Sequence, residues 1–421
     1  MKKFKILWFS PTDLSPNSNS ADRGWVNILL DEVKERVDLH VAVVEGNTNA
    51  VIEGVTKHNV RVKYRKMRIA LHALYGYRNT EGDLKQELES LVKSVKPDLV
   101  HIHGTEKQFI KVIPFLNEEN IPYLISIQGI ISIISRKYTA GYSERFIKKF
   151  ITHRGVTKTQ ILPRTNRRIY KAFLSHAQLE EKMLQLVQNF SGRTAWDETI
   201  PSLLNSDANY YKNDRILKPI FYESSWNNIR TDLNHILIHT TTSNSFYKGF
   251  EIIAESAFLL KRNGLTIEWC IAGLSSNDWS VKAAKKVLKE RFDSTCFTFM
   301  GKITSKQIVE SMQAADLYVS ASHIENSPNN VAEAQLLGIP CIASDVGGTS
   351  TYIENNISGV LIPPGDPYAL AATIKNLSQD EKKRKLLALA SRKTALLRHD
   401  KKRIVSTLLE DYRTIINSMI R

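Results

Sequence analysis

Short apolar runs alternate with helical patterns along this chain, and the whole alternation occurs twice. The apolar runs have the length of buried β-strands, and residues 25–36 and 250–261 carry helical patterns between them. The first set of runs is residues 6–9, 39–44, 99–103 and 123–127, and the second is residues 236–239, 267–271, 317–320 and 341–344. Strands that alternate with helices form parallel sheets. The sequence therefore predicts an α/β protein with two parallel-sheet domains.

A chain of 421 residues, of which 42% are apolar, can bury two cores. A polar, irregular stretch at residues 205–232 separates the two sets of runs and is the predicted hinge. We expect a first domain over residues 1–215, a second over residues 216–400, and an amphipathic terminal helix within residues 401–421.

Neither a membrane span nor a secretion signal is expected. No apolar run reaches the roughly 18 residues that a span requires. The apolar run near the N-terminus is too short for a signal peptide and is followed by Pro11. Cys270 and Cys341 lie inside apolar runs and Cys296 lies apart from them, which fits reduced thiols. We therefore expect a cytoplasmic protein.

Two glutamates in the second half, Glu325 and Glu333, lie eight positions apart. Residues 315–321 read as a buried strand, and Pro328 suits the first turn of a helix. This places Glu325 in the loop before the helix and Glu333 about one turn inside it. The N–H groups at the start of that helix would form an anion site. They belong to residues near Asn329, Asn330 and Val331.

The segment after these glutamates supports a ligand site. A single helical glutamate is usually a solvated surface residue. Here an apolar strand and then Gly347 and Gly348 follow, so that Glu333 and the paired glycines lie near carboxyl ends of strands, where open α/β sheets bind ligands. Two carboxylates beside a phosphate-sized positive spot suit a nucleotide-sugar.

At these residues the chain resembles the retaining nucleotide-sugar glycosyltransferases of family four, which have the GT-B architecture. The resemblance rests on the Glu-x7-Glu pattern, the Gly-x-Pro turn at Gly338 and the Asp-x-Gly-Gly loop. The Lys-Gly loop at residues 246–250 and the strand ends at residues 270–273 and 299–302 extend it, so that it covers nearly all of residues 235–375. Residues 191–197 are similar to a subset of the family with a Gly-Arg-Thr-x-Trp-Asp segment.

The resemblance implies two Rossmann-like domains that face each other across a cleft. It also implies that the terminal helix crosses back to the first domain, although an ordinary terminal helix fits the pattern equally well. The implied activity is transfer of a sugar, of hexose type, from a nucleoside diphosphate to a hydroxyl acceptor with retention of the anomeric configuration. The acceptor is expected to be a glycan or lipid-linked molecule of bacterial surface polysaccharide or glycolipid biosynthesis.

The resemblance also assigns roles. Glu333 would hold ribose hydroxyls and Glu325 the hydroxyls of the donor sugar, while Lys248 would stabilise the departing diphosphate. The catalytic candidates are Glu325, His103 and Lys248. The donor-binding candidates are Glu333, Lys248, Gly249, Ser327, Asn329, Asn330, Val331, Gly301, Lys302, Gly347, Gly348 and Arg193. The acceptor-side candidates are Gly24, Arg23 and Gln128.

The chain departs from the family pattern at three places. Gly24 stands alone where the family has a glycine pair, with Arg23 beside it. Gln128 replaces a histidine, and glutamine cannot act as a base near neutral pH. Residues 241–245 lack the arginine that usually precedes the Lys-Gly loop, so that either the hydroxyls there or Arg193 would have to compensate.

We expect no cofactor and no metal ion. His101 and His103 share one strand face, but no cysteine or carboxylate cluster accompanies them. The chain contains no Asp-x-Asp sequence, which fits stabilisation of the leaving group by lysine and a helix dipole.

Positive charge is concentrated between residues 131 and 171, where eleven Lys and Arg stand against one acid, Glu144. Apolar residues at 130–134 and 146–150 lie among these cations, a combination typical of an interfacial membrane anchor. We expect peripheral binding at the inner, anionic face of the membrane, and a solvated basic face is the alternative. No recognition motif for nucleic acid accompanies the charge.

Two other functions remain open. One is a different GT-B reaction, such as that of a sugar-nucleotide epimerase or a glycan phosphorylase. The other is a catalytically degenerate protein that binds a glycan or a membrane.

Overall fold

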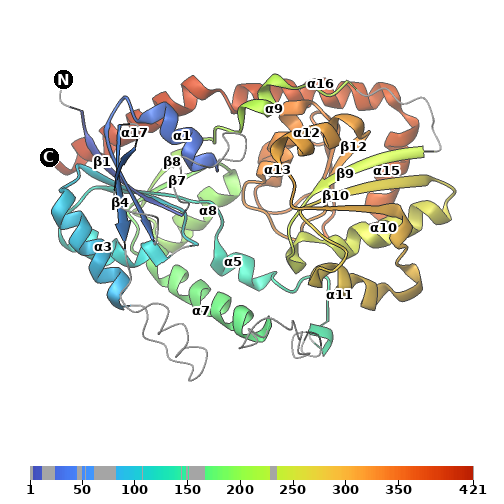
Figure 1. Cartoon of the computed structure of the whole chain (residues 1–421), viewed down its shortest axis with the longest axis horizontal. Coiled ribbons are helices and arrows are strands. Elements are labelled where there is room, and N and C mark those ends of the chain that lie inside the picture. Colours follow the sequence, from blue (N-terminus) through green and yellow to red (C-terminus); the bar gives the residue numbers. More distant parts are fainter. Residues whose placement is uncertain are drawn as a thin grey trace.

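The computed structural model describes residues 3–11, 24–44, 50–52, 54–60, 82–106, 108–143, 145–147, 150, 166–227 and 235–420. Two α/β domains lie side by side (Figure 1), each with a sheet between layers of helices. The predicted α/β class with two Rossmann-like sheets is confirmed. No helix in these ranges is long and apolar enough to span a membrane.

The first sheet has the strand order β3-β4-β2-β1-β5-β6-β7-β8. Only the β3–β4 pair is antiparallel among its described pairings. Its strands are β1 (Lys5–Ser10), β2 (Asp38–Val44), β3 (Ala50–Ile52), β4 (Val55–Val60), β5 (Leu99–His103), β6 (Tyr123–Ser126), β7 (Asn189–Gly192) and β8 (Asn209–Lys212). The order reverses between β1 and β5, and ligands of open α/β sheets bind at such a point.

The second sheet has the order β11-β10-β9-β12-β13-β14, and its described pairings are all parallel. Its strands are β9 (His235–Thr241), β10 (Thr266–Ala272), β11 (Phe297–Gly301), β12 (Leu317–Ser320), β13 (Cys341–Ser344) and β14 (Val360–Ile362). All four residues of β12 and of β13 are buried, because helices cover both faces of the sheet. Here the order reverses between β9 and β12.

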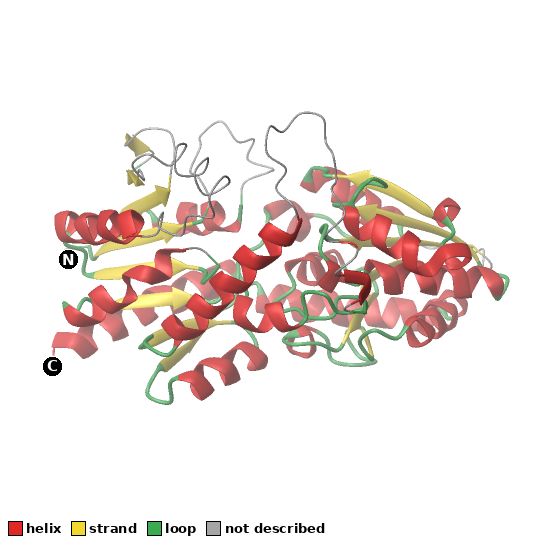
Figure 2. Ribbon diagram, turned by 90° about the horizontal axis from the view of Figure 1, so that it is seen from below, coloured by secondary structure: helices red, strands yellow, loops and turns green. Residues whose placement is uncertain are grey.

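Helices cover both faces of each sheet (Figure 2). Those before β9 are α1 (Trp25–Val33), α3 (Gly82–Val95), α4 (Ile113–Glu118), α5 (Ile131–Arg136), α7 (Asn166–Leu184), α8 (Ala195–Leu204) and α9 (Pro219–Glu223). Those after it are α10 (Phe250–Arg262), α11 (Trp279–Leu288), α12 (Ser305–Ala314), α13 (Asn329–Leu337), α14 (Thr349–Tyr352), α15 (Pro367–Gln379), α16 (Glu381–Arg398) and α17 (Lys401–Ile420).

Local sequence explains where α13 ends, but its start differs from the prediction. Gly338 stops the helix with a left-handed φ of 81°, a conformation that glycine adopts without strain. Pro328, which we expected in the first turn, is instead the N-cap residue. The helix begins one residue later, at Asn329.

The predicted irregular hinge at residues 205–232 is wrong in part. It contains β8, which pairs with β7 as the edge strand of the first sheet, and the short helix α9. Tyr210 and Tyr211 lie in β8. Two adjacent aromatic residues between polar ones were too short a pattern to be read as a strand.

The C-terminal helix α17 packs against the first sheet, as Figure 1 shows by the red helix beside β1. Its apolar side joins Ile6 and Trp8 of β1 in one buried cluster. Tyr412 of α17 anchors the contact, because its hydroxyl accepts a bond of 3.0 Å from Trp8 Nε1 and lies 2.6 Å from His101 Nδ1. Burial lowers the pKa of His101 to about 3, so its ring is neutral and Nδ1 can accept from that hydroxyl.

We predict that Tyr412→Phe destabilises the first domain by about 1–3 kcal/mol, since it leaves buried polar atoms of Trp8 and His101 without a partner. Chemical denaturation followed by tryptophan fluorescence measures this loss. Tyr368→Phe is the matched control, because Tyr368 is 68% exposed. Equal stability of the two variants would contradict the role given to Tyr412.

Candidate functional site

The candidate site lies where loops from both sheets meet. The loops after β5 and β12 follow the carboxyl ends of strands that border the points of reversed order. One loop carries Gly104 and the other carries Glu325, and hydrogen bonds described below connect the two domains here.

Lys248 and Glu325 form an ion pair in the second domain. Lys248 Nζ lies 2.5 Å from Glu325 Oε1, and their side chains are only 20% and 11% exposed. Ser322 Oγ donates to the same carboxylate oxygen over 2.7 Å. Burial alone would lower the pKa of Lys248, but Glu325 and Tyr247 together raise it, so the ammonium stays charged. Two predicted catalytic residues are therefore in direct contact.

Three predicted glycines let backbone segments pass close to this pair. Gly249 has a φ of 70°, and a Cβ atom there would collide with the carbonyl of Ala321. Gly347 and Gly348 pass the carbonyls of Glu325 and Asn326 in the same way, and Gly348 N donates to Glu325 O over 3.0 Å. The paired glycines therefore fix the loop that carries Glu325.

The start of α13 has the positive end of a helix dipole and no side-chain cap. Its first-turn residues are only partly free, because Asn330 Oδ1 accepts from the N–H of Val331 over 3.0 Å. Asn330 Nδ2 donates to Thr241 O at the end of β9 over 2.9 Å, which ties the helix to the segment that lacks the family arginine. Of the predicted anion site, the N–H groups of Asn329 and Asn330 remain, because the N–H of Val331 is engaged by Asn330 Oδ1.

Glu333 lies one turn farther along α13. Burial raises its pKa to about 7, although Lys218 and Arg215 act in the opposite direction. Its carboxyl is therefore close to half ionised at neutral pH. Gly301 is the last residue of β11 and Lys302 follows it, and a Cβ atom at Gly301 would meet open space.

The Gly-Arg-Thr-x-Trp-Asp segment folds around a buried carboxylate. Asp197 is 0% exposed, and its Oδ1 accepts from the backbone N–H groups of Arg193 and Thr194, each over 3.1 Å. Thr194 caps α8 by accepting from the N–H of Asp197, which completes a capping box. Tyr210 of β8 donates its hydroxyl to the same Oδ1 atom.

This arrangement directs Arg193 from the first domain to the second. Its Nε donates to Ser327 Oγ over 2.9 Å, and its Nη2 donates to Ile127 O over 2.8 Å. A second link runs the other way, where Asn326 Nδ2 donates to Gln128 O over 3.0 Å. Arg193 thus reaches the loop before α13, and Ser327 is its partner.

The predicted catalytic residue His103 is enclosed within the first domain. Its side chain is 0% exposed and is surrounded by the rings of Trp8, Trp25 and His101. Burial lowers its pKa, so the ring is neutral. Alternation along β5 placed both histidines on one face correctly, but the aromatic residues that cover His103 come from β1 and α1.

Gln128 and Gly24 lie on the first-domain side as expected, whereas Arg23 is outside the described residues. The Nε2 atom of Gln128 is buried and has no hydrogen-bond partner among the described residues. Gly24 is the N-cap of α1.

Sequence reasoning missed two charged residues of the site. Glu106 follows the loop after β5, and its carboxylate lies so close to Gly104 that a Cβ atom there would collide with it. Burial raises its pKa, and Glu180 raises it further. Arg215, on the connection between the domains, is buried beside Arg193. Neither residue belongs to a recognisable motif, so only the fold identifies them.

The protein itself covers several of the apolar side chains that we expected in a membrane anchor. Ile130 and Ile131 are buried in the first domain. Phe146, Ile147 and Phe150 pack on the second domain in an aromatic cluster. This cluster contains Tyr138, Tyr142, Phe146, Ile147, Phe150, Phe246, Trp279 and Ala283. Most cations of residues 148–169 lie outside what the structure describes.

Residues 230–394 match the protein family described as “Glycosyl transferases group 1”. The matched residues lie in the second domain. The match supports the resemblance to family four.

Curated relatives agree with the family. The amylovoran biosynthesis glycosyltransferase AmsK of Erwinia amylovora is 30% identical over 32% of this chain and 34% of its own length. An N,N'-diacetylbacillosaminyl-diphospho-undecaprenol alpha-1,3-N-acetylgalactosaminyltransferase of Campylobacter jejuni is 27% identical over 48% of this chain and 52% of its own. The chain thus spans about a third to a half of the length of these two relatives.

Solved structures share the fold over nearly the whole chain. Sucrose-phosphate synthase from Thermosynechococcus elongatus aligns with a TM-score of 0.69 at 14% identity, over 98% of this chain and 99% of its own. Anabaena Alr3699/HepE, solved in complex with UDP and glucose, aligns with a TM-score of 0.65 at 14% identity, over 97% and 99%. At 14% sequence identity, these alignments show a shared fold.

We predict that affinity for a nucleotide-sugar increases as the pH rises from about 6 to about 8, because Glu333 with its pKa of about 7 then ionises. An ionised carboxylate accepts stronger hydrogen bonds from hydroxyls than a protonated one does. Glu333→Gln should bind more weakly and without this pH dependence, as measured by calorimetry.

Glu310→Gln is the control, since Glu310 is an exposed residue of α12. It should keep the wild-type pH profile. A profile that persists in Glu333→Gln would show that another group titrates.

Proposed function

We propose that the chain is a retaining glycosyltransferase that moves a sugar from a nucleoside-diphosphate-sugar to a hydroxyl of a glycan or lipid-linked acceptor, without a metal ion. The donor lies between Glu333 and the Lys248–Glu325 pair, with its diphosphate at the start of α13. The observation that carries the proposal is the pairing of Lys248 with Glu325 beside that uncapped helix start, reached from the first domain by Arg193.

The chemistry follows from charge. When the bond between sugar and diphosphate breaks, negative charge grows on the diphosphate, and positive groups already in place lower the barrier. Lys248 and the N–H groups of Asn329 and Asn330 are available on the second domain. Arg193 takes the place of the arginine that the family has before the Lys-Gly loop, because its guanidinium already contacts Ser327 in the loop before α13.

Glu325 has two tasks in this proposal. Its carboxylate holds Lys248 in position through Oε1, which also accepts from Ser322. It also accepts hydrogen bonds from the hydroxyls of the donor sugar, next to the reacting carbon. Both tasks concern the transition state more than the binding of a free nucleoside diphosphate.

The test uses a panel of UDP-, GDP- and ADP-sugars, with thermal shift for binding and donor-dependent release of nucleoside diphosphate for turnover. Glu325→Gln should lower turnover about 10²–10³-fold without lowering affinity for the free nucleoside diphosphate. Activity should persist in EDTA, and the anomeric configuration of the product, read by NMR, should match that of the donor.

Glu310→Gln should behave as the unchanged protein in the same assays. Three results would overturn the proposal: no donor bound by the wild type, full activity of Glu325→Gln, or phosphate-dependent turnover in place of transfer.

We also propose that the acceptor is presented at an anionic membrane surface, held by charge alone. The support is the excess of cations at residues 131–171, of which Arg136, Lys137 and Lys171 are exposed in the structure. Each cation near an anionic leaflet contributes about 1 kcal/mol, and salt screens that attraction.

The protein should sediment with anionic but not zwitterionic vesicles, and high salt should release it. Glutamate at positions 136, 137 and 171 together should weaken sedimentation. The matched control reverses Lys282, Lys285 and Lys286, which are exposed on α11 of the second domain. Equal loss in both triple variants would mean that net charge, and not this surface, is responsible.

A further inference from the structure

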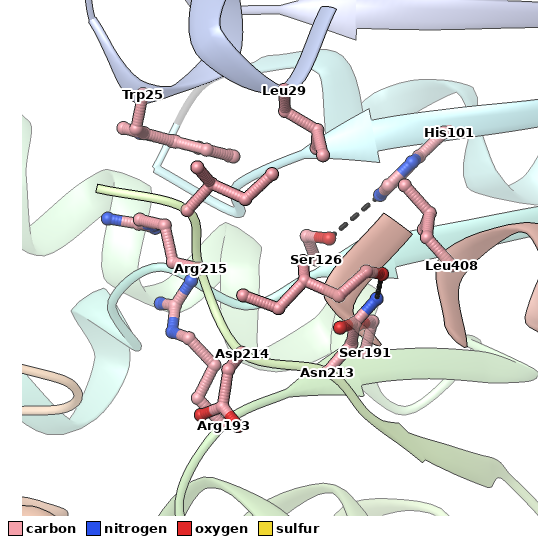
Figure 3. A pocket seen from close by; sticks show the side chains of 12 residues that line it. Trp25, Leu29, His101, Ser126, Ser191, Arg193, Asn213, Asp214, Arg215 and Leu408 are labelled. Atoms are coloured by element: carbon pink, nitrogen blue, oxygen red, sulfur yellow. Dashed lines mark hydrogen bonds between the residues drawn. The ribbon is translucent and has the colours of Figure 1, made fainter. Parts of the chain in front are cut away.

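A cavity in the first domain contains charged groups for which no role has yet been given. It contains about 430 Å³ of space not filled by atoms, part of which is open solvent. It lies between α1, the ends of the sheet strands and α17 (Figure 3). Its lining residues are Trp25, Leu29, His101, Ser126, Ser191, Arg193, Asn213, Asp214, Arg215, Ile216, Ile404 and Leu408. Because Arg193 also contacts Ser327, the cavity adjoins the loop before α13.

Arg215 is the unusual member of this lining. The residue is only 7% exposed, and its Nε and Nη2 atoms are buried without a hydrogen-bond partner in the described part of the chain. Its guanidinium lies 4.0 Å from the centre of the Trp25 ring, which fixes its plane and leaves its N–H edge free. An arginine does not lose its charge in proteins, so such a buried, unpaired edge is costly.

Among the described residues, no carboxylate forms a direct ion pair with Arg215. Burial lowers the pKa of Arg215, and the neighbouring charge of Arg193 lowers it further. Glu106 and Glu333 act in the opposite direction, but neither forms an ion pair with Arg215 in the described residues. Asp214 is held by Arg403 over 3.1 Å and lies 4.0 Å from Arg398.

The start of α1 adds positive potential to the cavity, and His101 is neutral. Trp25 is the first residue of α1, whose N-terminus has no side-chain cap and no acid in its first turn. His101 is neutral, as its pKa of about 3 shows. Figure 3 shows Arg193 and Arg215 on the same side of the cavity as Trp25.

We propose that Arg215, with Trp25 above it and Arg193 beside it, binds a phosphate group carried by the acceptor, so that the transferase selects sugar phosphates or sugar diphosphates attached to a lipid. A guanidinium edge matches two phosphate oxygens, and a planar ring beside it can stack on a sugar. The site belongs to the first domain, whereas Lys248 and the start of α13 bind the donor diphosphate from the second. This inference rests on the proposed function, whose acceptor it specifies.

The test measures binding of a hexose 1-phosphate by calorimetry, in the presence of a saturating nucleoside diphosphate found in the donor panel. The wild type should bind the hexose phosphate and the nucleoside diphosphate at the same time. Arg215→Gln should weaken hexose phosphate binding at least about tenfold, and far more than nucleoside diphosphate binding, which depends on Arg215 only through the ionisation of Glu333. Arg215→Lys, which keeps the charge and loses the forked edge, should fall between the two.

Arg36→Gln is the matched control, because Arg36 is exposed on the same domain. It should bind as the wild type does, and circular dichroism shows whether each variant is folded. If Arg215→Gln does not fold, Arg215→Lys and Trp25→Phe decide the matter, since both should weaken hexose phosphate binding.

Three outcomes would overturn the inference. They are displacement of the hexose phosphate by the nucleoside diphosphate, unchanged affinity in the folded Arg215 variants, and equal affinity for inorganic phosphate and hexose 1-phosphate, which would indicate a site for free phosphate. Failure of the proposed function is distinct, because it would appear as no binding of any nucleoside diphosphate by the wild type.

Discussion

The buried carboxylate of Asp197 is the interaction on which the site between the domains depends. It accepts hydrogen bonds from two backbone N–H groups and from Tyr210, and through them it holds the turn that carries Arg193. Replacing it would leave three donors unsatisfied in a region without water access. Asp197 is therefore a positioning residue. It holds the turn from which the Arg193 guanidinium reaches Ser327 of the other domain.

The domains are joined by contacts of different physical kinds. Arg193 and Asn326 make polar links across the cleft. The cluster around Phe246 and Trp279 is instead an apolar contact, made from the first domain by Tyr138, Tyr142, Phe146, Ile147 and Phe150. The helix α17 adds a third, because it continues from α16 of the second domain and buries its apolar side on the first. The polar links lie at the loops that hold the ligand candidates, so movement of the domains and arrangement of the site are coupled.

The pair formed by Lys248 and Glu325 connects the fold with the proposed chemistry. Each side chain is largely buried, and each neutralises the other in the absence of a ligand. A donor that brings a diphosphate to Lys248 and hydroxyls to Glu325 provides both with new partners. The free-energy cost of burying the two charges is offset by their mutual attraction before binding and by contacts with the donor afterwards.

Sequence patterns identified elements whose cause is local. The alternation of strands and helices, the end of α13 at Gly338, and the close backbone passages at Gly249 and Gly347 all follow from side-chain periodicity or from the freedom of glycine. What covers the aromatic residues Phe146 and Phe150 was not predictable, for the opposite reason. Their apolar character was evident, but whether lipid or protein covers them is not a local property.

The sequence by itself determined the α/β class, the two sheets and the family signature, because hydrophobic period and glycine chemistry act between residues close in the chain. Only the tertiary structure decided that His103 is enclosed by Trp8 and Trp25, and that Arg215 lies unpaired beside Arg193. Burial and electrostatic environment are set by residues distant in sequence, since desolvation depends on everything that surrounds a group in space. The surrounding fold therefore decides whether a residue of a given type lies on the surface, in the core or in a binding site.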